Sequence, residues 1–346
     1  MLSKIYELIS KYPKLTDIHI SADDYIYIRI LWNLQKVSDD KLTSEQVSEL
    51  QNEIFDQNTN KSENISDLYI SNKDQQTSSQ QILPNPPMEI DTSRTYQNYS
   101  FRANIYSKWG NASIAIRKLN ENTINIYDIM TKKLADTIVK NLLQAQGWLI
   151  LVTWSTGSGK STTIAAMINW INNNLCQHII TLEDPIEYIF TNHKSLISQR
   201  QIAKDTKDFS TWIRSILRQN PDTILIWEIR DAETALAAIN MAESWHLVFA
   251  TLHTRNASQT VSRLASFVRS DQKDEIQLRL SMSLLGVICQ KLISDGNKLT
   301  AIYEYMYNNS AISNIIKKWE FYQIPNCIMT GKTNGMTSMD DYQKSL

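Results

Sequence analysis

The pattern of apolar and polar residues divides the chain into two parts. In the first part, apolar residues recur at helical spacing or alternate with polar residues over short runs, which is typical of amphipathic helices and half-buried strands. We therefore predict that residues 1–118 form a small α+β domain. Its predicted elements are a helix at residues 1–10, strands at 17–21, 25–31 and 34–37, a helix at 43–57, and strands at 99–106 and 112–117.

A polar stretch interrupts this first part. Residues 58–97 are rich in Asn, Ser, Gln, Asp and Pro, and such a composition offers few apolar side chains for a core. We predict that its middle, residues 71–87, is a mobile surface insertion with no chemistry of its own. Residues 119–128 are the expected linker to the second domain.

In the second part, short apolar strands alternate with helical patterns. A helix from Ile129 leads to the first strand, and the alternation is typical of a parallel sheet covered by helices. Polar or charged residues follow every one of these strands, at the edge where open α/β sheets bind ligands. The sequence thus predicts an α/β domain over residues 129–346, with strands at 149–153, 178–182, 223–226 and 247–252.

Composition and charge indicate an ordinary globular protein. The 346 residues suffice for two domains, the hydrophobic content is 42% and the formal net charge is -1. A nucleic-acid-binding protein usually has a basic patch or a high pI, so this balance argues against nucleic acid as a partner. No apolar run is long enough to span a bilayer, and the amphipathic start is not a signal sequence. We therefore expect a cytoplasmic chain with no transmembrane segment.

Cysteine usage adds no site. Cys176, Cys289 and Cys327 are far apart and odd in number, so they form neither a disulfide framework nor a Cys-x-x-Cys metal site. Each is expected to be a reduced, partly buried thiol.

A phosphate-binding loop is predicted between the strand at 149–153 and the helix that follows. Residues 154–161 match the pattern G-x-x-x-x-G-K-[ST] except at the first position, which holds Trp154. In such a loop, backbone N–H groups hold phosphate, Lys160 reaches the β- and γ-phosphates and the Ser161 hydroxyl ligates Mg²⁺. The alternative is a chance Gly-Ser-Gly-Lys turn at a helix start. The predicted nucleotide-binding residues of the loop are Ser155, Thr156, Gly157, Ser158, Gly159, Lys160, Ser161 and Thr162.

Acidic residues follow two of the other strands. Glu183, Asp184 and Glu187 could hold a magnesium-bound water or polarise the attacking water; the alternative is a proline turn with solvated acids. Glu228 ends an apolar strand in the Walker B pattern and would act on Mg²⁺ or its waters. Asp231 is predicted to cap the next helix.

Several basic residues are candidates with open alternatives. Arg214 and Arg218 are four residues apart on a predicted helix, where they form either a solvated surface or an arginine finger that contacts phosphate across a subunit boundary. Arg230, beyond the Walker B strand, is a third finger candidate. His246 and His253 flank the fourth strand, and two histidines without a third ligand do not argue for zinc.

The chain resembles the type IV pilus retraction ATPases (PilT-like) of the secretion ATPase superfamily over nearly its whole length. Several unlinked motifs in the right order make the resemblance specific. They are Thr16–Ser21, the loop at 154–161, an aspartate box at 181–187, Walker B around Glu228, a histidine box at 245–254, a C-terminal helix at 311–318 and residues 335–340.

The resemblance implies a fold, an activity and an assembly. It implies a PAS-like N-terminal domain, a RecA-like ATPase domain, and a homohexamer that hydrolyses ATP with Mg²⁺ at the inner face of the cytoplasmic membrane, beneath an inner-membrane pilus platform protein. By position, Glu187 corresponds to the family's catalytic glutamate and Glu228 to its Walker B glutamate, while the role of Glu183 stays open. Arg102 and Arg117 correspond to N-terminal-domain arginines that face nucleotide.

Tryptophan is the largest departure from the family. The chain has nine tryptophans, and its eight glycines are about a third of the usual share of roughly 7%. Trp245 and Trp319 directly follow predicted helices, where a left-handed glycine is favoured, and two others stand in predicted hairpin turns, where positive φ is needed. Those that stand where relatives commonly have glycine are Trp32, Trp109, Trp148, Trp154, Trp212, Trp227, Trp245 and Trp319.

We hypothesise that these eight residues are glycine in the living cell. The source would read a stop codon such as UGA as glycine, whereas the written sequence translates it as tryptophan. Trp170, in the helix after the loop, is expected to be a real aromatic residue. The alternative is a divergent or degenerate protein, since tryptophan at positive φ is a steric outlier.

The predicted function is that of a hexameric motor ATPase that couples MgATP hydrolysis to type IV pilus retraction and twitching motility. One alternative is a secretion or pilus-extension ATPase, although extension motors usually carry a cysteine-tetrad zinc site, which is missing here. Another is a non-catalytic ring subunit, if Trp154 is genuine.

Overall fold

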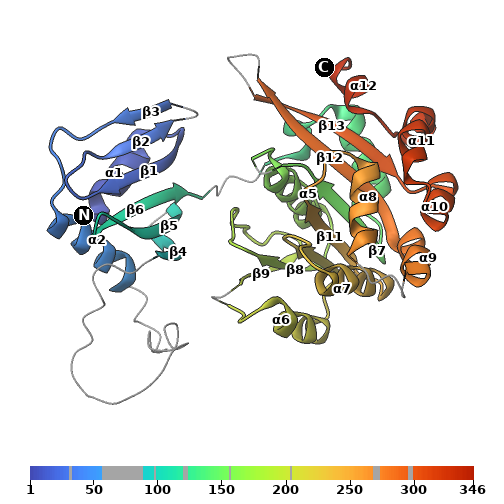
Figure 1. The fold of residues 1–346 in the computed structure, drawn as a ribbon, viewed down its shortest axis with the longest axis horizontal. Helices are drawn as coiled ribbons and strands as arrows, with labels where there is room; N and C mark the ends of the chain where they lie inside the picture. Colours follow the sequence, from blue (N-terminus) through green and yellow to red (C-terminus); the bar gives the residue numbers. More distant parts are fainter. Residues whose placement is uncertain are drawn as a thin grey trace. The chain divides into compact units, whose positions relative to one another are not determined.

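The chain folds into two compact units, residues 1–121 and 122–346 (Figure 1). The computed structural model describes residues 1–30, 33–56, 89–96, 99–119, 124–155, 157–202, 205–267, 273–294 and 299–346. The predicted insertion at 71–87 and the turn residue Trp32 lie outside them. Within the predicted linker at 119–128, a helix already begins at Ile126. Among the described residues, no helix is both long and apolar enough to cross a membrane.

The N-terminal unit is a six-stranded antiparallel sheet with two helices. The strand order is β3-β2-β1-β6-β5-β4. The predicted helices and strands are present, and β4 is an additional strand that the polar composition of its region concealed. The elements are α1 Leu2–Lys11, β1 Leu15–Ser21, β2 Tyr27–Ile30, β3 Asn33–Lys36, α2 Ser44–Asp56, β4 Glu89–Tyr96, β5 Tyr99–Lys108 and β6 Asn111–Lys118.

Alternation along the strands builds the core of this unit. On β1, Ile18 and Ile20 are buried while Asp17 and His19 lie on the opposite face, because successive side chains of a strand point to opposite sides. The buried positions pack with apolar residues of α1 and α2, such as Ile5. The other face of the sheet is left to polar side chains.

The second unit is a mixed α/β fold around a seven-stranded sheet. The strand order is β13-β12-β7-β11-β10-β8-β9; β12 and β13 pair antiparallel and all other neighbours pair parallel. The strands are β7 Trp148–Thr153, β8 His178–Glu183, β9 Leu196–Gln201, β10 Thr223–Ile226, β11 Leu247–Leu252, β12 Leu284–Ser294 and β13 Leu299–Tyr307. The predicted parallel sheet is thus present, with β9, β12 and β13 as strands that were not predicted.

Helices connect β7 to β8, β9 to β10, β10 to β11 and β11 to β12. A short π-helical segment, η2, continues α4, and 3₁₀ turns continue α6 and precede or follow α11. The helical elements are α3 Ile126–Ile129, α4 Lys132–Ile138, η2 Val139–Leu143, α5 Lys160–Asn174, α6 Phe209–Ile216, η3 Leu217–Gln219, α7 Ala232–Glu243, α8 Ala257–Ser266, α9 Lys273–Ser283, α10 Ser310–Lys317, η5 Phe321–Gln323, α11 Ile324–Thr330, η6 Gly331–Asn334 and α12 Met339–Gln343.

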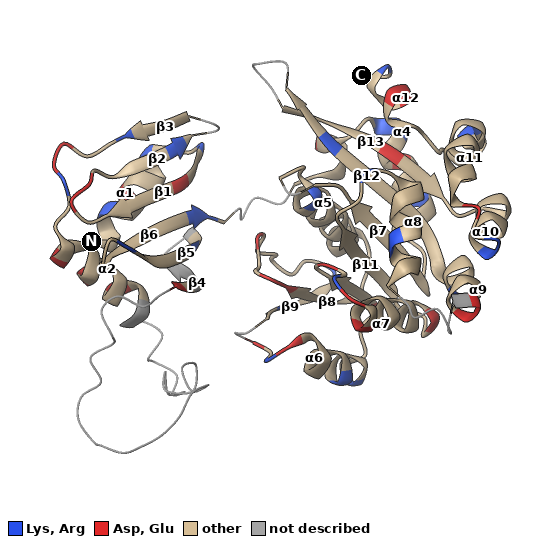
Figure 2. Ribbon diagram, viewed as in Figure 1, with Lys and Arg blue, Asp and Glu red and all other residues tan. Residues whose placement is uncertain are grey.

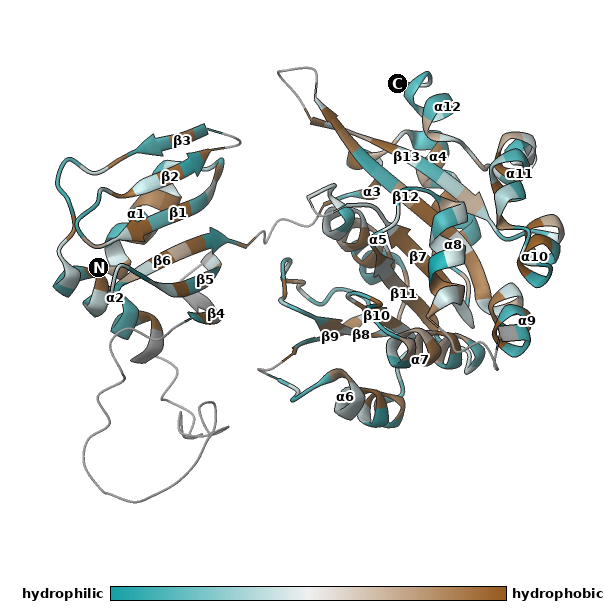
Figure 3. Ribbon diagram, viewed as in Figure 1, coloured by the Kyte–Doolittle hydropathy of each residue, from teal (hydrophilic) through white to brown (hydrophobic). Residues whose placement is uncertain are grey.

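Helices cover both faces of the sheet, and the central strands are mostly apolar (Figure 3). On β7, Leu149 and Leu151 pack into one cluster with residues of α7, α8 and α10, whereas Ile150 and Val152 pack into another with residues of α4 and α5. All four are fully buried. A parallel strand buried on both faces reads as a continuous apolar run, as this one does.

The three cysteines are free, but their burial differs from the expectation. Cys289 is buried, Cys327 is half-buried and Cys176 is exposed. The prediction of a partly buried thiol is therefore wrong for Cys176, which follows the end of α5 and the extended residue Leu175.

Four of the tryptophans that the structure describes have positive φ. Trp245 (φ 70) and Trp319 (φ 59) follow α7 and α10. After α7, the N–H of Trp245 bonds to Ala242 O and that of the next residue to Met241 O, and the same pair of bonds follows α10. This is the Schellman motif, whose left-handed position is usually glycine. Trp109 (φ 55) and Gly110 (φ 79) form a two-residue hairpin turn with positive φ at both positions, which favours Asn-Gly or Gly-Gly.

Only some of the eight tryptophans that stand where relatives commonly have glycine have positive φ. Trp154 also has positive φ, at 153°, and the other two described residues with positive φ that are not glycine are Asp23 and Asn220, types that tolerate it. Trp148, Trp212 and Trp227 do not have positive φ, so an expectation of positive φ at every one of the eight positions is wrong.

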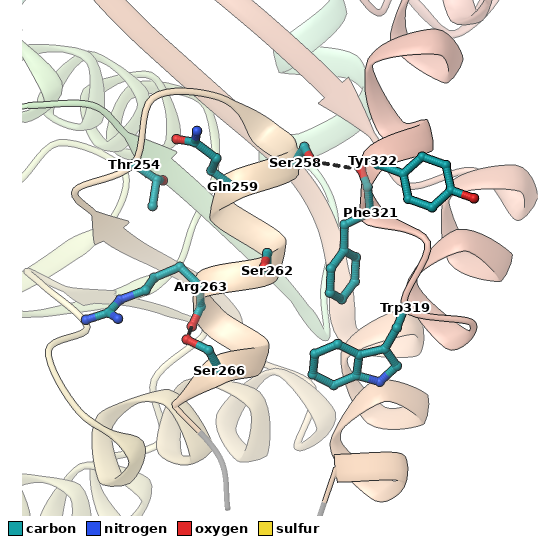
Figure 4. Close-up of a pocket in the computed structure, with 9 residues that line it drawn as sticks. All are labelled: Thr254, Ser258, Gln259, Ser262, Arg263, Ser266, Trp319, Phe321 and Tyr322. Carbon is teal, nitrogen blue, oxygen red and sulfur yellow. Dashed lines mark hydrogen bonds between the residues drawn. The ribbon is translucent and has the colours of Figure 1, made fainter. Parts of the chain in front are cut away.

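Trp319 also lines a groove beside α8. Its ring lies 5.1 Å from that of Phe321, centroid to centroid. Figure 4 shows both rings facing α8, where the Ser258 hydroxyl donates to Phe321 O (2.7 Å). The groove holds about 530 Å³. A glycine at 319 would keep the backbone turn and enlarge this groove.

Glycine at the two helix ends is expected to stabilise the fold. A residue with a Cβ costs roughly 1–2 kcal/mol in the left-handed region, so Trp245→Gly should raise the free energy of unfolding by about 1 kcal/mol. Trp319→Gly should raise it by a smaller amount, because that variant also loses the contact between the rings of Trp319 and Phe321. Urea unfolding followed by circular dichroism measures both. The matched control is Trp170→Gly inside α5, which should destabilise because glycine weakens a helix interior. A loss of stability in Trp245→Gly would contradict the backbone argument.

Candidate active site

The predicted loop connects the end of β7 to the start of α5. Gly157 (φ 77) and Gly159 (φ 85) both lie in the left-handed region, and Gly159 is the N-cap of α5. Glycine adopts this conformation without steric cost. Thr156 lies outside the described residues. The strand, loop and helix thus have the arrangement that a phosphate-binding loop requires.

Lys160 begins α5 and folds back over the loop. Its Nζ donates to the carbonyl of Trp154 (2.7 Å) and to that of Ser155 (3.0 Å). Burial lowers the pKa of the ammonium, while the charges of Glu228 and Glu187 raise it. The structure therefore brings one lysine and two of the three predicted catalytic glutamates into one electrostatic site.

Two features of the loop fit an anion. The Ser158 Oγ is buried and has no hydrogen-bond partner among the described residues. A Cβ at Gly159 would lie 2.7 Å from Gln290 Nε2, so the backbone at this position is closely packed. Next to the loop, Thr162 Oγ1 lies 2.7 Å from the hydroxyl of Tyr188. The residues present thus fit a nucleotide phosphate.

Glu183 is buried at the end of β8, where it is 2% exposed. Its Oε1 accepts hydrogen bonds from Thr181 Oγ1 (2.7 Å) and Gln199 Nε2 (3.0 Å). Burial raises the pKa of Glu183 to about 7, because its effect is larger than that of the two hydrogen bonds, which lower the pKa. Gln199 lies on β9, and nothing in its sequence context marked it as part of the site.

The burial of Glu183 predicts a pH-dependent stability. The Glu183 carboxyl group binds its proton more tightly in the folded state than in the unfolded chain, where its pKa is the ordinary 4.5. Its contribution to the free energy of unfolding therefore falls as the pH rises from about 4.5 to about 7. The fall is roughly 3 kcal/mol. Glu183→Gln keeps the two acceptor contacts and removes the titration. Urea unfolding of both proteins from pH 4.5 to 8 should show the difference between them changing by this amount, and a constant difference would contradict it.

Glu228 follows β10, and its carboxylate contacts the side chains of Arg230 and His253. Arg230 Nε lies 2.7 Å from its Oε2, and His253 Nε2 lies 3.2 Å from its Oε1. Arg230 also pairs with Asp184 at 3.5 Å. The side chain of Glu228 is 18% exposed and lines a cavity of about 270 Å³ together with Asp184 and Arg230. The histidine box and the acidic strand ends therefore meet at one edge of the sheet.

The remaining predicted residues lie elsewhere or have local roles. Arg214 is in α6, whereas Arg218 lies in the 3₁₀ turn that continues this helix beyond Ile216, so the two do not share one α-helix as predicted; both side chains are exposed. His246 Nδ1 is 2.9 Å from Met241 O at the end of α7. Asp231 caps α7 through the N–H of Thr234 (2.8 Å), as predicted.

In the N-terminal unit, Arg102 and Arg117 are register partners on β5 and β6. Arg117 Nε donates to Asp17 Oδ1 on β1 at 2.8 Å. The basic positions on β5 and β6 and the acidic position on β1 are visible in Figure 2. The three residues line a cavity of about 350 Å³ on the polar face of the sheet.

Among the described residues, no group of three or more His, Cys, Asp or Glu side chains could hold a metal ion. Mg²⁺ is usually bound through one or two protein oxygens together with water and phosphate. The two predicted oxygen donors, Ser161 and Glu228, lie at the start of α5 and in the segment after β10.

A parallel sheet with a glycine-and-lysine loop at the end of one strand, and acidic residues at the ends of its neighbours, defines a P-loop ATPase domain. The type II/IV secretion system protein family matches residues 52–332. The chain belongs to this family.

Named relatives and a solved structure agree. The chain is 38% identical to the twitching motility protein of Neisseria gonorrhoeae over 75% of its own length and 69% of the relative's. It is 38% identical to the type IV pilus retraction ATPase PilT of Pseudomonas aeruginosa over 71% of each chain. The crystal structure of the pilus retraction motor PilT with bound ADP matches with a TM-score of 0.80 and 30% identity, covering 99% of this chain and 96% of that one. The resemblance drawn from the sequence motifs is confirmed.

Proposed function

We propose that the chain is a hexameric motor that couples MgATP hydrolysis to retraction of a type IV pilus. The observation that carries the proposal is the phosphate loop between β7 and α5, with Gly157 and Gly159 in the left-handed region and Lys160 folded over the loop carbonyls. Two relatives at 38% identity are named for twitching motility and pilus retraction. The proposal includes a RecA-like ATPase domain, a PAS-like N-terminal domain and a position at the inner face of the cytoplasmic membrane, beneath a pilus platform protein.

In this proposal, each residue has a distinct task. Lys160 and the N–H groups of residues 155–162 bind the β- and γ-phosphates, and Ser161 and Glu228 hold Mg²⁺ or its waters, which neutralises the charge that develops on the phosphates. Glu187 positions or deprotonates the attacking water. Buried Glu183 supports the site through its hydrogen bonds to Thr181 and Gln199.

Arginines complete the site across subunit boundaries. Arg102 and Arg117 of one subunit would face the nucleotide of its neighbour, and Arg214, Arg218 or Arg230 would act as an arginine finger. Arg214 and Arg218 are exposed, and Arg230 pairs with Glu228, so its release from that carboxylate would accompany such a role.

The proposal also includes glycine at the tryptophan positions. Positive φ at Trp109, Trp154, Trp245 and Trp319 supports it, because glycine is the residue that adopts this conformation without strain. For Trp32 the support is its place in a predicted hairpin turn together with the resemblance, and for Trp148, Trp212 and Trp227 it is the resemblance alone. If Trp154 is genuine, a non-catalytic ring subunit is the second candidate function, since the strained loop would bind nucleotide poorly.

Deletion of the gene in its native host tests the motor assignment. Loss of a retraction motor should leave cells with more surface pili and no twitching, because assembly continues without disassembly. Cells without pili would instead indicate an extension motor, and a defect in protein secretion with normal pili would indicate a secretion ATPase.

A further inference from the structure

Gln290 is a buried amide in contact with the phosphate loop. It lies on β12, the strand next to β7, and is 2% exposed. Its Nε2 donates to the carbonyl of Ser158 at 2.9 Å, and its Oε1 accepts from the hydroxyl of Thr163 at 2.5 Å. One side chain, more than a hundred residues away in sequence, thus joins the loop to the first turn of α5.

We propose that Gln290 is a positioning residue that sets the orientation of the peptide between Ser158 and Gly159 for nucleotide binding. The inference rests on the proposed ATPase function. In a trans peptide, the C=O and N–H groups point in opposite directions. Because Gln290 holds the Ser158 carbonyl, the Gly159 N–H points away from Gln290, where it can donate to a phosphate.

The packing at Gly159 matches this role. A Cβ at this position would meet Gln290 Nε2 at 2.7 Å, and φ is 85°. The amide therefore lies directly against the loop backbone, in space that only glycine leaves open. The contact between Gln290 and the loop therefore depends on glycine at position 159.

Thr163 fixes which way the amide faces. Its hydroxyl donates to Oε1, so the NH₂ group is the end that faces Ser158. Tyr303 on β13 adds a further hydroxyl 3.2 Å from Thr163. The amide is held in the donating orientation by groups that do not themselves contact the loop carbonyl.

Without the Gln290 amide donor, no side chain among the residues that the structure describes holds the Ser158 carbonyl in its orientation. Glycine on one side of the peptide permits rotation, and a flipped peptide would turn a carbonyl oxygen toward the phosphate instead of an N–H. The expected defect is therefore in nucleotide affinity, beyond any loss of stability from the buried polar groups left unpaired.

The first test compares Gln290→Leu with Thr163→Val in the full chain carrying glycine at 154. Both variants break the same buried network, but only the first removes the donor to Ser158. We measure the Kd of a fluorescent ADP analogue with Mg²⁺ and the thermal midpoint of unfolding. Both midpoints should fall, and the Kd of Gln290→Leu should rise about tenfold; the Kd of Thr163→Val should rise less, because the Gln290 amide keeps its NH₂ donor and loses only the contact that orients it. Equal Kd values for Gln290→Leu and its parent would overturn the proposal.

The second test uses Gln290→Glu and pH. A neutral carboxyl group can donate to the Ser158 carbonyl as the amide does, whereas a carboxylate cannot. The Kd of this variant relative to its parent should therefore be near one at pH 6 and rise about tenfold by pH 8. A purely structural role would give a ratio that does not change with pH, which would contradict the proposal. A parent that binds no nucleotide at any pH would instead overturn the proposed function itself.

Discussion

Replacing Trp154 with glycine is expected to tighten nucleotide binding about five- to thirtyfold. Trp154 has φ 153° and is half-buried against the apolar core. Its carbonyl accepts a hydrogen bond from Lys160, so this residue shapes the loop. Holding a residue in this sparsely populated backbone region costs roughly 1–2 kcal/mol, which favours other conformations of residue 154. The nucleotide affinity falls in proportion to the fraction of chains in the binding-competent conformation. Glycine removes that strain.

The measurement is the Kd of a fluorescent ADP analogue, followed by the rate of ATP hydrolysis. Trp154→Ala is the matched control, because it removes the indole but keeps a Cβ and therefore most of the strain. If alanine restores binding as well as glycine does, the bulk of the indole and not the backbone is responsible. Peptide mass spectrometry of the protein from its native source, over residues 147–160, gives the direct answer: glycine at 154 supports the proposal, and tryptophan there makes the non-catalytic subunit the leading function.

Replacing Lys160 with alanine should abolish ATP turnover. Its Nζ is held over the loop by two carbonyls and lies in the field of Glu187 and Glu228, where it can move to the phosphates and stabilise the charge that develops on them. Loss of one such group typically costs about 10²-fold or more in rate. The assay is phosphate release by the full chain carrying glycine at 154.

Lys133→Ala on the exposed side of α4 is the control for Lys160→Ala, since it removes the same side chain outside the site. It should keep full activity. Hydrolysis that persists in Lys160→Ala would remove the basis of the ATPase assignment.

Local sequence patterns predicted much of the fold. The strands β7, β8, β10 and β11 and the helix after the loop were predicted to within a residue or two at the strand ends, because continuous apolar runs followed by polar residues are typical of buried parallel strands. The run at Leu284–Gln290 was not assigned, since a short apolar run does not distinguish a strand from a buried helix. Strand β4 has few apolar residues and is defined by its pairing with β5.

The same division applies to the site. The phosphate loop and Lys160 lie within one short segment, so spacing alone identified them. The two carboxylates whose charges act on Lys160 come from the segments that follow β10 and β8, and the sheet order decides which strands adjoin β7. For Arg218 the sequence prediction failed within a local element, because α6 ends at Ile216, two residues before it, and a 3₁₀ turn follows.

By itself, the sequence determined the loop chemistry, the alternation of strands and helices, and the positions past α7 and α10 where the backbone turns left-handed, because each depends on neighbours within a few residues. Only the tertiary structure decided that Gln290 contacts Ser158, that His253 and Arg230 share Glu228, and that Glu183 is buried with a raised pKa. These contacts join residues whose separation along the chain carries no signal, and they exist because packing a seven-stranded sheet between two layers of helices brings those strand ends together.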